Sequence, residues 1–108
     1  HAAPTFIYQF NWCSRAMNGA LAATHSLEIP FAFDNLDQAG VDFFIGPGPL
    51  PQALAETMHR AWCAFIKTGE PGWTAYNTET RATMFFDDSC ELVENPDPQE
   101  RAAWEGFR

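Results

Sequence analysis

The sequence is short of charge, and of positive charge above all. Only 19% of its 108 residues are charged, and six Lys and Arg face fourteen Asp and Glu, for a formal net charge of -8 at pH 7. Lys and Arg form no cluster anywhere along the chain. A protein that binds a phosphate backbone carries such a cluster, so we expect no nucleic-acid partner.

Long apolar runs and paired cysteines are also missing. No run approaches the ~18 residues of a membrane span, and residues 1–10 lack the basic start and long apolar centre of a secretory signal. We therefore expect a soluble, cytoplasmic protein with no membrane partner. Cys13, Cys63 and Cys90 are widely spaced without a C-x-x-C pair, which predicts neither a disulfide scaffold nor a zinc knuckle. Cys63 falls in an apolar helical pattern and is predicted to be a buried thiol in a reducing compartment.

Motifs that would complete a catalytic or cofactor site are absent as well. No serine lies in the G-x-S-x-G turn that exposes a hydrolase nucleophile. Residues 46–48, Gly-Pro-Gly, lack the lysine and following helix of a phosphate loop. His25 and Glu28 are three residues apart and could supply two metal ligands, but a tight site needs three or four. We expect no metal and no cofactor.

Aromatic and apolar residues, by contrast, are abundant. Hydrophobic residues make up 46% of the chain, which has ten Phe, four Trp and two Tyr. This composition argues against intrinsic disorder, and the length allows one domain at most. A folded chain of this size buries only about two thirds of the surface that its unfolded form exposes. We therefore expect some of the aromatic side chains to be covered by neighbouring polypeptide.

Periodicity and turn residues predict the elements of the first half. Aromatic residues alternate over residues 5–12, which predicts a strand. The small residues of 13–23 predict a loop or a short helical turn, and Pro30 argues against a helix through Ile29. Residues 34–51 are rich in Gly and Pro and are predicted to connect elements rather than form one.

An amphipathic helix from Pro51 is the clearest element of the second half. Gly69 and Pro71 end it, and its apolar stripe is predicted to be core: Leu54, Met58, Ala61, Trp62, Phe65 and Ile66. Residues 82–86 and 91–93 flank an Asp-Asp-Ser turn and predict a small hairpin. A last helix is predicted over 98–107, capped by Asp97, with Trp104 facing inward.

The histidines are the residues most open to a chemical role. His25 precedes an apolar run, where a lone histidine is either a satisfied structural residue or a functional one, and the pattern alone leaves both open. His59 follows Met58 in the helix and is predicted to be a solvated or boundary side chain. His1 carries no positional information.

The order of these segments resembles the C-terminal end of the type B carboxylesterases, the family of para-nitrobenzyl esterases and cholinesterases. Two motifs carry the resemblance: H-x-x-E-x-P-F-x-F at residues 25–33 and W-x-x-F-x-x-T-G-x-P at residues 62–71. The likeness covers nearly the whole chain and extends to residues 6–10, 23–36, 73–76, 79–84 and 95–104. One departure is Thr74, which stands where the family has proline in its W-P-x-Y turn.

The resemblance implies roles for four residues. His25 occupies the place of the family's catalytic histidine, which takes a proton from a serine nucleophile and returns it to the leaving alcohol. Glu28 matches the acidic residue that follows the histidine by three and supports it. Glu28 is not the triad acid, because the family's triad acid comes from much earlier in its chain. Phe31 and Phe33 either line the wall of the acyl pocket or fill the core behind it.

The resemblance also implies an α/β fold. Residues 1–108 would form the C-terminal part of an α/β-hydrolase domain, with an aromatic strand, a long amphipathic helix, a short β-hairpin and a C-terminal helix, and no complete domain alone. Nucleophile, triad acid and oxyanion hole would come from a missing N-terminal portion, and the substrate would be a small ester. We expect the isolated chain to be inactive and to self-associate. The alternatives are a non-catalytic binding or assembly module derived from the esterase fold, and a plain structural domain.

Overall fold

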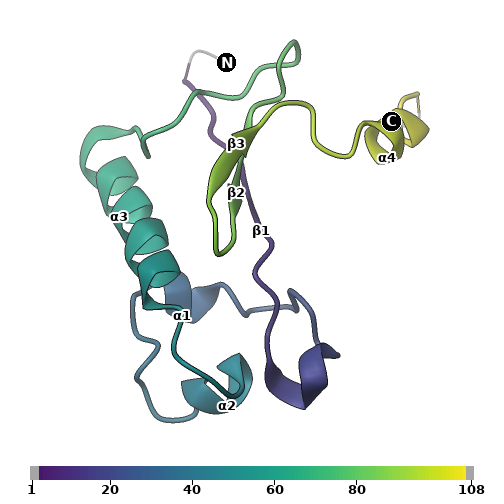
Figure 1. Ribbon diagram of the computed structural model, residues 1–108. Helices are drawn as coiled ribbons and strands as arrows, with labels where there is room; N and C mark the ends of the chain where they lie inside the picture. Colours follow the sequence, from purple (N-terminus) through teal and green to yellow (C-terminus); the bar gives the residue numbers. More distant parts are fainter. Residues whose placement is uncertain (1–2, 107–108) are drawn as a thin grey trace.

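The computed structural model describes residues 3–106 and places a three-stranded mixed sheet beside one long helix (Figure 1). The strands are β1 (Tyr8–Phe10), β2 (Thr83–Phe86) and β3 (Glu91–Val93), in the order β1-β2-β3. β1 and β2 are parallel, with Tyr8 opposite Met84, whereas β2 and β3 form an antiparallel hairpin. The carboxyl ends of β1 and β2 therefore point to the same end of the molecule.

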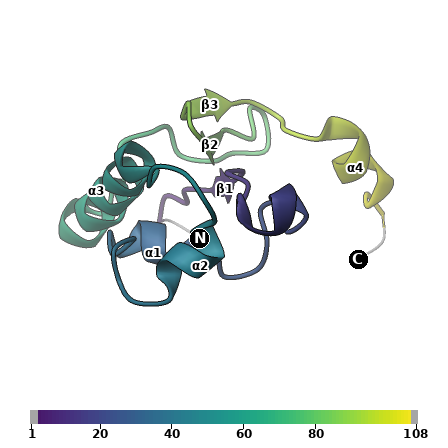
Figure 2. The same cartoon turned by 60° about the horizontal axis from the view of Figure 1, so that its bottom comes forward.

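The helices gather mostly at that end and along one side. They are the 3-10 helix η1 (Ala16–Gly19) and the α-helices α1 (Ile29–Ala32), α2 (Val41–Ile45), α3 (Gln52–Thr68) and α4 (Pro98–Ala103). η1, α1 and α2 lie beyond the carboxyl ends of β1 and β2, and α3 runs back alongside the sheet (Figure 1). In both views α4 stands on the other side of the sheet from α3 (Figure 1, Figure 2).

The strongly periodic elements are confirmed. α3 begins one residue after Pro51 and ends at Thr68, before Gly69, which adopts a left-handed φ of 84°. The hairpin pairs β2 with β3 across residues 87–90, as expected. The first strand is shorter than its aromatic alternation predicts, because only Tyr8–Phe10 pair with β2.

Three expectations are wrong. A helix does include Ile29, because Pro30 occupies its first turn, where the missing N–H has no helical partner to lose. The connector at 34–51 contains α2, enclosed by Gly40 and Gly46, both with positive φ. Trp104 is 72% exposed rather than inward-facing. Asp97 does precede α4, but its side chain makes no capping hydrogen bond; Phe107 lies outside the described residues.

The core sits between the first half of α3, the helices α1 and α2, and the ends of β1 and β2. Phe31 is its centre, with its ring centroid 4.9 Å from that of Phe10 and 5.3 Å from that of Trp12. The cluster of buried residues comprises Trp12, Leu27, Phe31, Leu36, Ile45, Leu54, Ala55, Met58 and Phe86. The stripe of α3 is thus core only in its first half, since Trp62, Phe65 and Ile66 are exposed.

Candidate functional site

His25 lies on a turn of residues 24–28 between η1 and α1, and its side chain is exposed. Two backbone hydrogen bonds close the turn: the N–H of Leu27 donates to the Thr24 carbonyl (3.2 Å), and that of Ile29 donates to the Ser26 carbonyl (3.3 Å). Leu27 is fully buried and anchors the turn in the core. The imidazole is therefore presented to the outside from a backbone that these hydrogen bonds fix.

Hydrogen bonds also fix the path from β1 to this turn. Trp12 is buried, and its indole N–H donates to Asp88 Oδ1 in the hairpin turn (3.2 Å). The Ser14 hydroxyl donates to the Phe44 carbonyl (2.7 Å) and accepts from the Ala16 N–H (3.0 Å). Because Ser14 is 1% exposed and its oxygen is occupied, it serves structure and is no nucleophile.

Glu28 is half-buried at the start of α1. Its carbonyl accepts the N–H groups of Phe31 and Ala32, at 3.0 and 2.9 Å. Burial raises the pKa of the Tyr8 hydroxyl on β1, the negative charge of Glu28 adds to the rise, and a hydrogen bond with Trp62 opposes it. The negative charge of Glu28 is thus felt at the Tyr8 hydroxyl on β1.

Phe31 and Phe33 lie in different environments, although the sequence assigns the same two possible roles to both. Phe31 is fully buried in the core, whereas Phe33 is 69% exposed at the end of α1. Core filling therefore describes Phe31 alone. Phe33 projects from the same short helix that follows the His25 turn, and any wall it forms must face polypeptide or ligand outside the described residues.

Two polar contacts that the sequence pattern does not indicate join α3 to the end of α1 and to the residue Asp34 just beyond it. His59 Nδ1 lies 2.8 Å from the Ala32 carbonyl oxygen, and its Nε2 lies 3.5 Å from Cys63 Sγ. The Gln52 amide donates to Asp34 Oδ1 (2.8 Å). His59 is half-buried, in line with a boundary position; Cys63 is also half-buried, so the prediction of a buried thiol is wrong.

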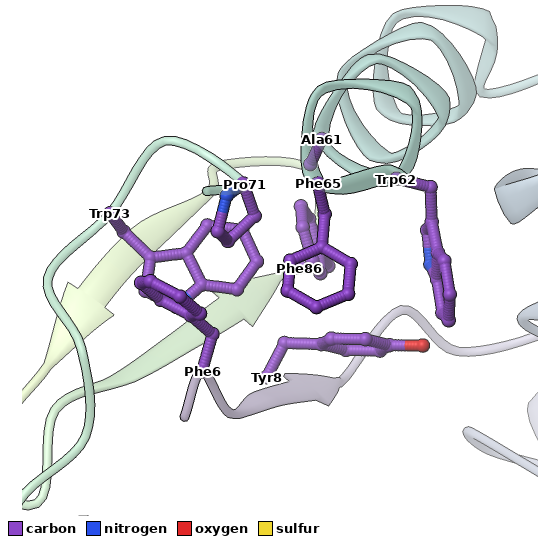
Figure 3. A pocket seen from close by; sticks show the side chains of 8 residues that line it. All are labelled: Phe6, Tyr8, Ala61, Trp62, Phe65, Pro71, Trp73 and Phe86. Atoms are coloured by element: carbon purple, nitrogen blue, oxygen red, sulfur yellow. The ribbon is translucent and has the colours of Figure 1, made fainter. Parts of the chain in front are cut away.

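A cavity of about 100 Å³ opens between β1, β2 and the exposed half of α3 (Figure 3). Aromatic rings in edge-on contact form much of its wall, with centroids of Tyr8 and Phe86 5.3 Å apart and those of Trp73 and Phe86 5.8 Å apart. Its lining is Phe6, Tyr8, Ala61, Trp62, Phe65, Pro71, Trp73 and Phe86. His25 is not among these residues, so the cavity and the histidine turn are separate features.

The described residues hold neither a metal cluster nor a complete nucleophilic site. Within residues 3–106, no three His, Cys, Asp or Glu side chains are grouped so that they could bind a metal ion. Neither a serine hydroxyl nor a carboxylate of residues 3–106 is hydrogen-bonded to His25. What the turn offers chemically is one exposed imidazole on a rigid support.

Comparison with known proteins shows that the chain is similar to parts of an esterase and of another hydrolase. No family model matches the chain. The para-nitrobenzyl esterase of Bacillus subtilis (strain 168) is 34% identical over 110 residues, which cover 94% of this chain and 22% of that protein. The phenmedipham hydrolase of Pseudarthrobacter oxydans is 34% identical over 93 residues, covering 79% of this chain and 19% of that protein.

Solved structures agree with these sequence matches. A PNB esterase structure superposes with a TM-score of 0.81 at 33% identity, over 94% of this chain and 22% of that one. The Geobacillus stearothermophilus carboxylesterase EST55 at pH 6.2 gives a TM-score of 0.79 at 36% identity, over 95% and 22%. The resemblance inferred from the two motifs is confirmed, and the chain spans only about a fifth of the length of its relatives.

Proposed function

We propose that this chain, a homologue of a segment of para-nitrobenzyl esterase and related carboxylesterases of the α/β-hydrolase fold, takes part in carboxylic ester hydrolysis within a longer enzyme. Its contribution is His25, acting as general base and then general acid. The observation that carries the proposal is the exposed imidazole on a hydrogen-bonded turn that the buried Leu27 anchors, beyond the carboxyl end of β1 (Figure 1). In α/β sheets, ligands bind beyond the carboxyl ends of the strands.

The chemistry assigned to His25 is proton transfer to and from a serine supplied by the rest of the enzyme. A ring nitrogen takes the hydroxyl proton as the serine oxygen bonds to the acyl carbon of the ester. The imidazolium then gives that proton to the alcohol oxygen as its bond to the acyl carbon breaks. A water molecule repeats the sequence on the acyl-serine, and releases the carboxylic acid and the free serine.

Three neighbouring residues support this role in different ways. Glu28 is half-buried, and its backbone carbonyl accepts the N–H groups of Phe31 and Ala32, so it supports the histidine turn by fixing the start of α1. Phe31 holds α1 in the core, and so holds the turn that precedes it. Phe33 projects outward and is the better placed of the two to meet the acyl group of a small ester once the upstream portion is present.

In this proposal the chain needs the upstream portion of the enzyme as its partner. Removal of the nucleophile or another triad member leaves only the residual catalysis of the oxyanion hole, and in this proposal the oxyanion hole is also supplied from upstream. The chain alone is therefore expected to be inactive. Within residues 3–106 no group of His, Cys, Asp and Glu side chains could hold a metal ion, and no helix is long and apolar enough to cross a membrane. We propose a cytoplasmic enzyme because its three cysteines are free thiols, as in a reducing compartment.

The test is turnover of a short-chain p-nitrophenyl ester by the full-length enzyme that carries this segment. His25→Ala is expected to lower kcat by about 10³-fold or more, since a triad member is lost. Arg60→Gln, on the exposed surface of α3, is the matched control and should retain activity. Full activity in the His25→Ala enzyme would refute the assignment.

The second candidate function is a non-catalytic binding or assembly module. The observation in its favour is the group of exposed apolar side chains on α3: Trp62, Phe65 and Ile66 are 39%, 43% and 76% exposed. This module would be favoured over the esterase if the full-length protein lacked a serine nucleophile and still formed a stable complex with another protein chain.

A further inference from the structure

A second reactive group lies on the side of α3 that faces α1, and the proposed esterase function does not use it. His59 and Cys63 are four residues apart on one helix, so their side chains share a face. Cys63 Sγ lies 3.5 Å from His59 Nε2, and the other ring nitrogen, Nδ1, lies 2.8 Å from the Ala32 carbonyl oxygen. Thiol, imidazole and backbone carbonyl are thus arranged in series.

The Ala32 carbonyl determines where the imidazole proton resides. A carbonyl oxygen only accepts hydrogen bonds, so His59 Nδ1 must carry the proton and donate it. In the neutral ring Nε2 is then an acceptor, and the Cys63 S–H is its donor. This is the order of groups that activates a nucleophile: a thiol, a base within reach of its proton, and a third group that orients the base.

The other two cysteines lack such a base. Cys13 Sγ donates to the Asn11 carbonyl (3.6 Å) and Cys90 Sγ donates to the Asp87 carbonyl (3.4 Å). A backbone carbonyl does not take up a proton, whereas an imidazole does. Because the thiolate rather than the thiol is the nucleophile, the two exposed cysteines are built-in controls for the half-buried one.

We propose that Cys63 is a thiol-modification site, activated by His59, that takes small neutral disulfides. The Cys63 S–H bond breaks and its proton passes to His59 Nε2, while Sγ attacks one sulfur of the disulfide. The S–S bond of the small molecule breaks as the new Sγ–S bond forms. Its second sulfur leaves as a thiolate and takes up the proton, so Cys63 ends oxidised in a mixed disulfide, and the reagent is half reduced.

The experiment measures the modification rate of each cysteine with 4,4′-dithiodipyridine, a neutral disulfide, by quenching the reaction and mapping peptides by mass. In the chain itself, Cys63 is expected to react faster than Cys90, although it is the less exposed of the two. His59→Gln keeps an N–H donor for Ala32 but provides no base, and is expected to slow Cys63 by about tenfold or more. His25→Gln removes an imidazole that contacts no cysteine, and should leave the Cys63 rate unchanged.

A repeat in 8 M urea completes the test. Loss of the fold separates His59 from Cys63, so the three cysteines should react at similar rates and the wild-type and His59→Gln chains should become alike. Either of two results overturns the proposal: a Cys63 that reacts more slowly than Cys90 in the native wild-type chain, or a Cys63 rate that is the same with and without His59. The first comparison uses the wild-type chain alone and holds even if His59→Gln fails to fold.

Discussion

Phe31 and Phe33 are two residues apart and have the same side chain, but they differ in burial. One is fully buried between Phe10, Trp12 and α3, and the other is 69% exposed. Phe31→Ala should therefore cost about 3–5 kcal/mol of unfolding free energy, because it leaves a cavity in the core. Phe33→Ala should stay within about 0.5 kcal/mol.

Urea unfolding of the two variants beside the wild-type chain measures both effects. Phe33→Ala is the matched control, since it removes the same ring two positions along. Equal losses of stability in the two variants would contradict the buried position of Phe31.

Tyr8 makes stability depend on alkaline pH. Its hydroxyl has a raised pKa, chiefly because it is buried and also because Glu28 is negative. Below the ordinary tyrosine pKa of about 10 both states are protonated. As pH rises past that value the unfolded chain loses the proton first, so the free energy of unfolding should fall until the folded-state pKa is passed.

Tyr8→Phe keeps the ring against Phe86 and removes the titrating hydroxyl. The slope of the unfolding free energy against pH above 10 should be shallower in this variant. Identical slopes for the variant and the wild type in denaturant titrations would show that the hydroxyl does not titrate differently in the fold.

At the level of elements, α2 depends on the two glycines that enclose it. Gly40 and Gly46 have φ of 91° and 92°, a conformation that costs other residues about 1–2 kcal/mol. The surroundings of the two differ. A Cβ at Gly40 would meet nothing within 4 Å, whereas one at Gly46 would overlap the backbone of Arg15 and Ala16.

Gly46→Ala should therefore destabilise the chain clearly more than Gly40→Ala. The first change adds a backbone clash, and Gly46, with ψ of -176°, is in a region that essentially only glycine adopts, whereas Gly40 is left-handed. Thermal or urea unfolding of the two variants provides the comparison. If both variants lost the same free energy of unfolding, the close approach of Gly46 to the start of η1 would be wrong.

Elements were predictable where a local pattern sufficed. The apolar residues of α3 recur at helical spacing from Leu54 to Ile66, and the helix ends at Thr68, before Gly69, so periodicity and a stop signal agree. α2 has five residues between two glycines, too few for a period to emerge. Trp104 was expected to face inward, but none of the residues of α4 is buried, and the helix stands away from α3 across the sheet (Figure 2).

The candidate site was predictable only in its local part. His25 and Glu28 stand out through a motif, and the closing hydrogen bonds of the turn are local too. The contacts that support the turn join distant residues, such as Ser14 with Phe44 and His59 with Ala32. Hydrogen bonds of this kind depend on tertiary packing and leave no periodic signal in the sequence.

On the scale of the whole molecule, the chain has more surface than a self-contained domain of its size. Its accessible surface is 7399 Å², against about 6000 Å² from the scaling of folded monomers with mass. The radius of gyration is 15.5 Å, against about 13 Å for a compact domain of this length. The exposed half of α3 contributes apolar area to this excess.

Self-association of the isolated chain is the expected consequence, because exposed apolar patches of this kind mark interaction surfaces. Ile66→Asp should shift the chain toward the monomer in sedimentation velocity. Ala53→Asp adds the same charge at an exposed position at the other end of α3 and should leave association as it is. A wild-type chain that stays monomeric at high concentration would exclude both this prediction and the assembly-module alternative.

The most direct measurement of the central claim is hydrolysis of a p-nitrophenyl ester by two separately purified parts, this chain and the upstream portion of its enzyme. We expect no turnover by either part alone, turnover on mixing, and none when the chain carries His25→Ala. Turnover by the chain alone that His25→Ala abolishes, or undiminished turnover of the mixture with the variant, would contradict that claim.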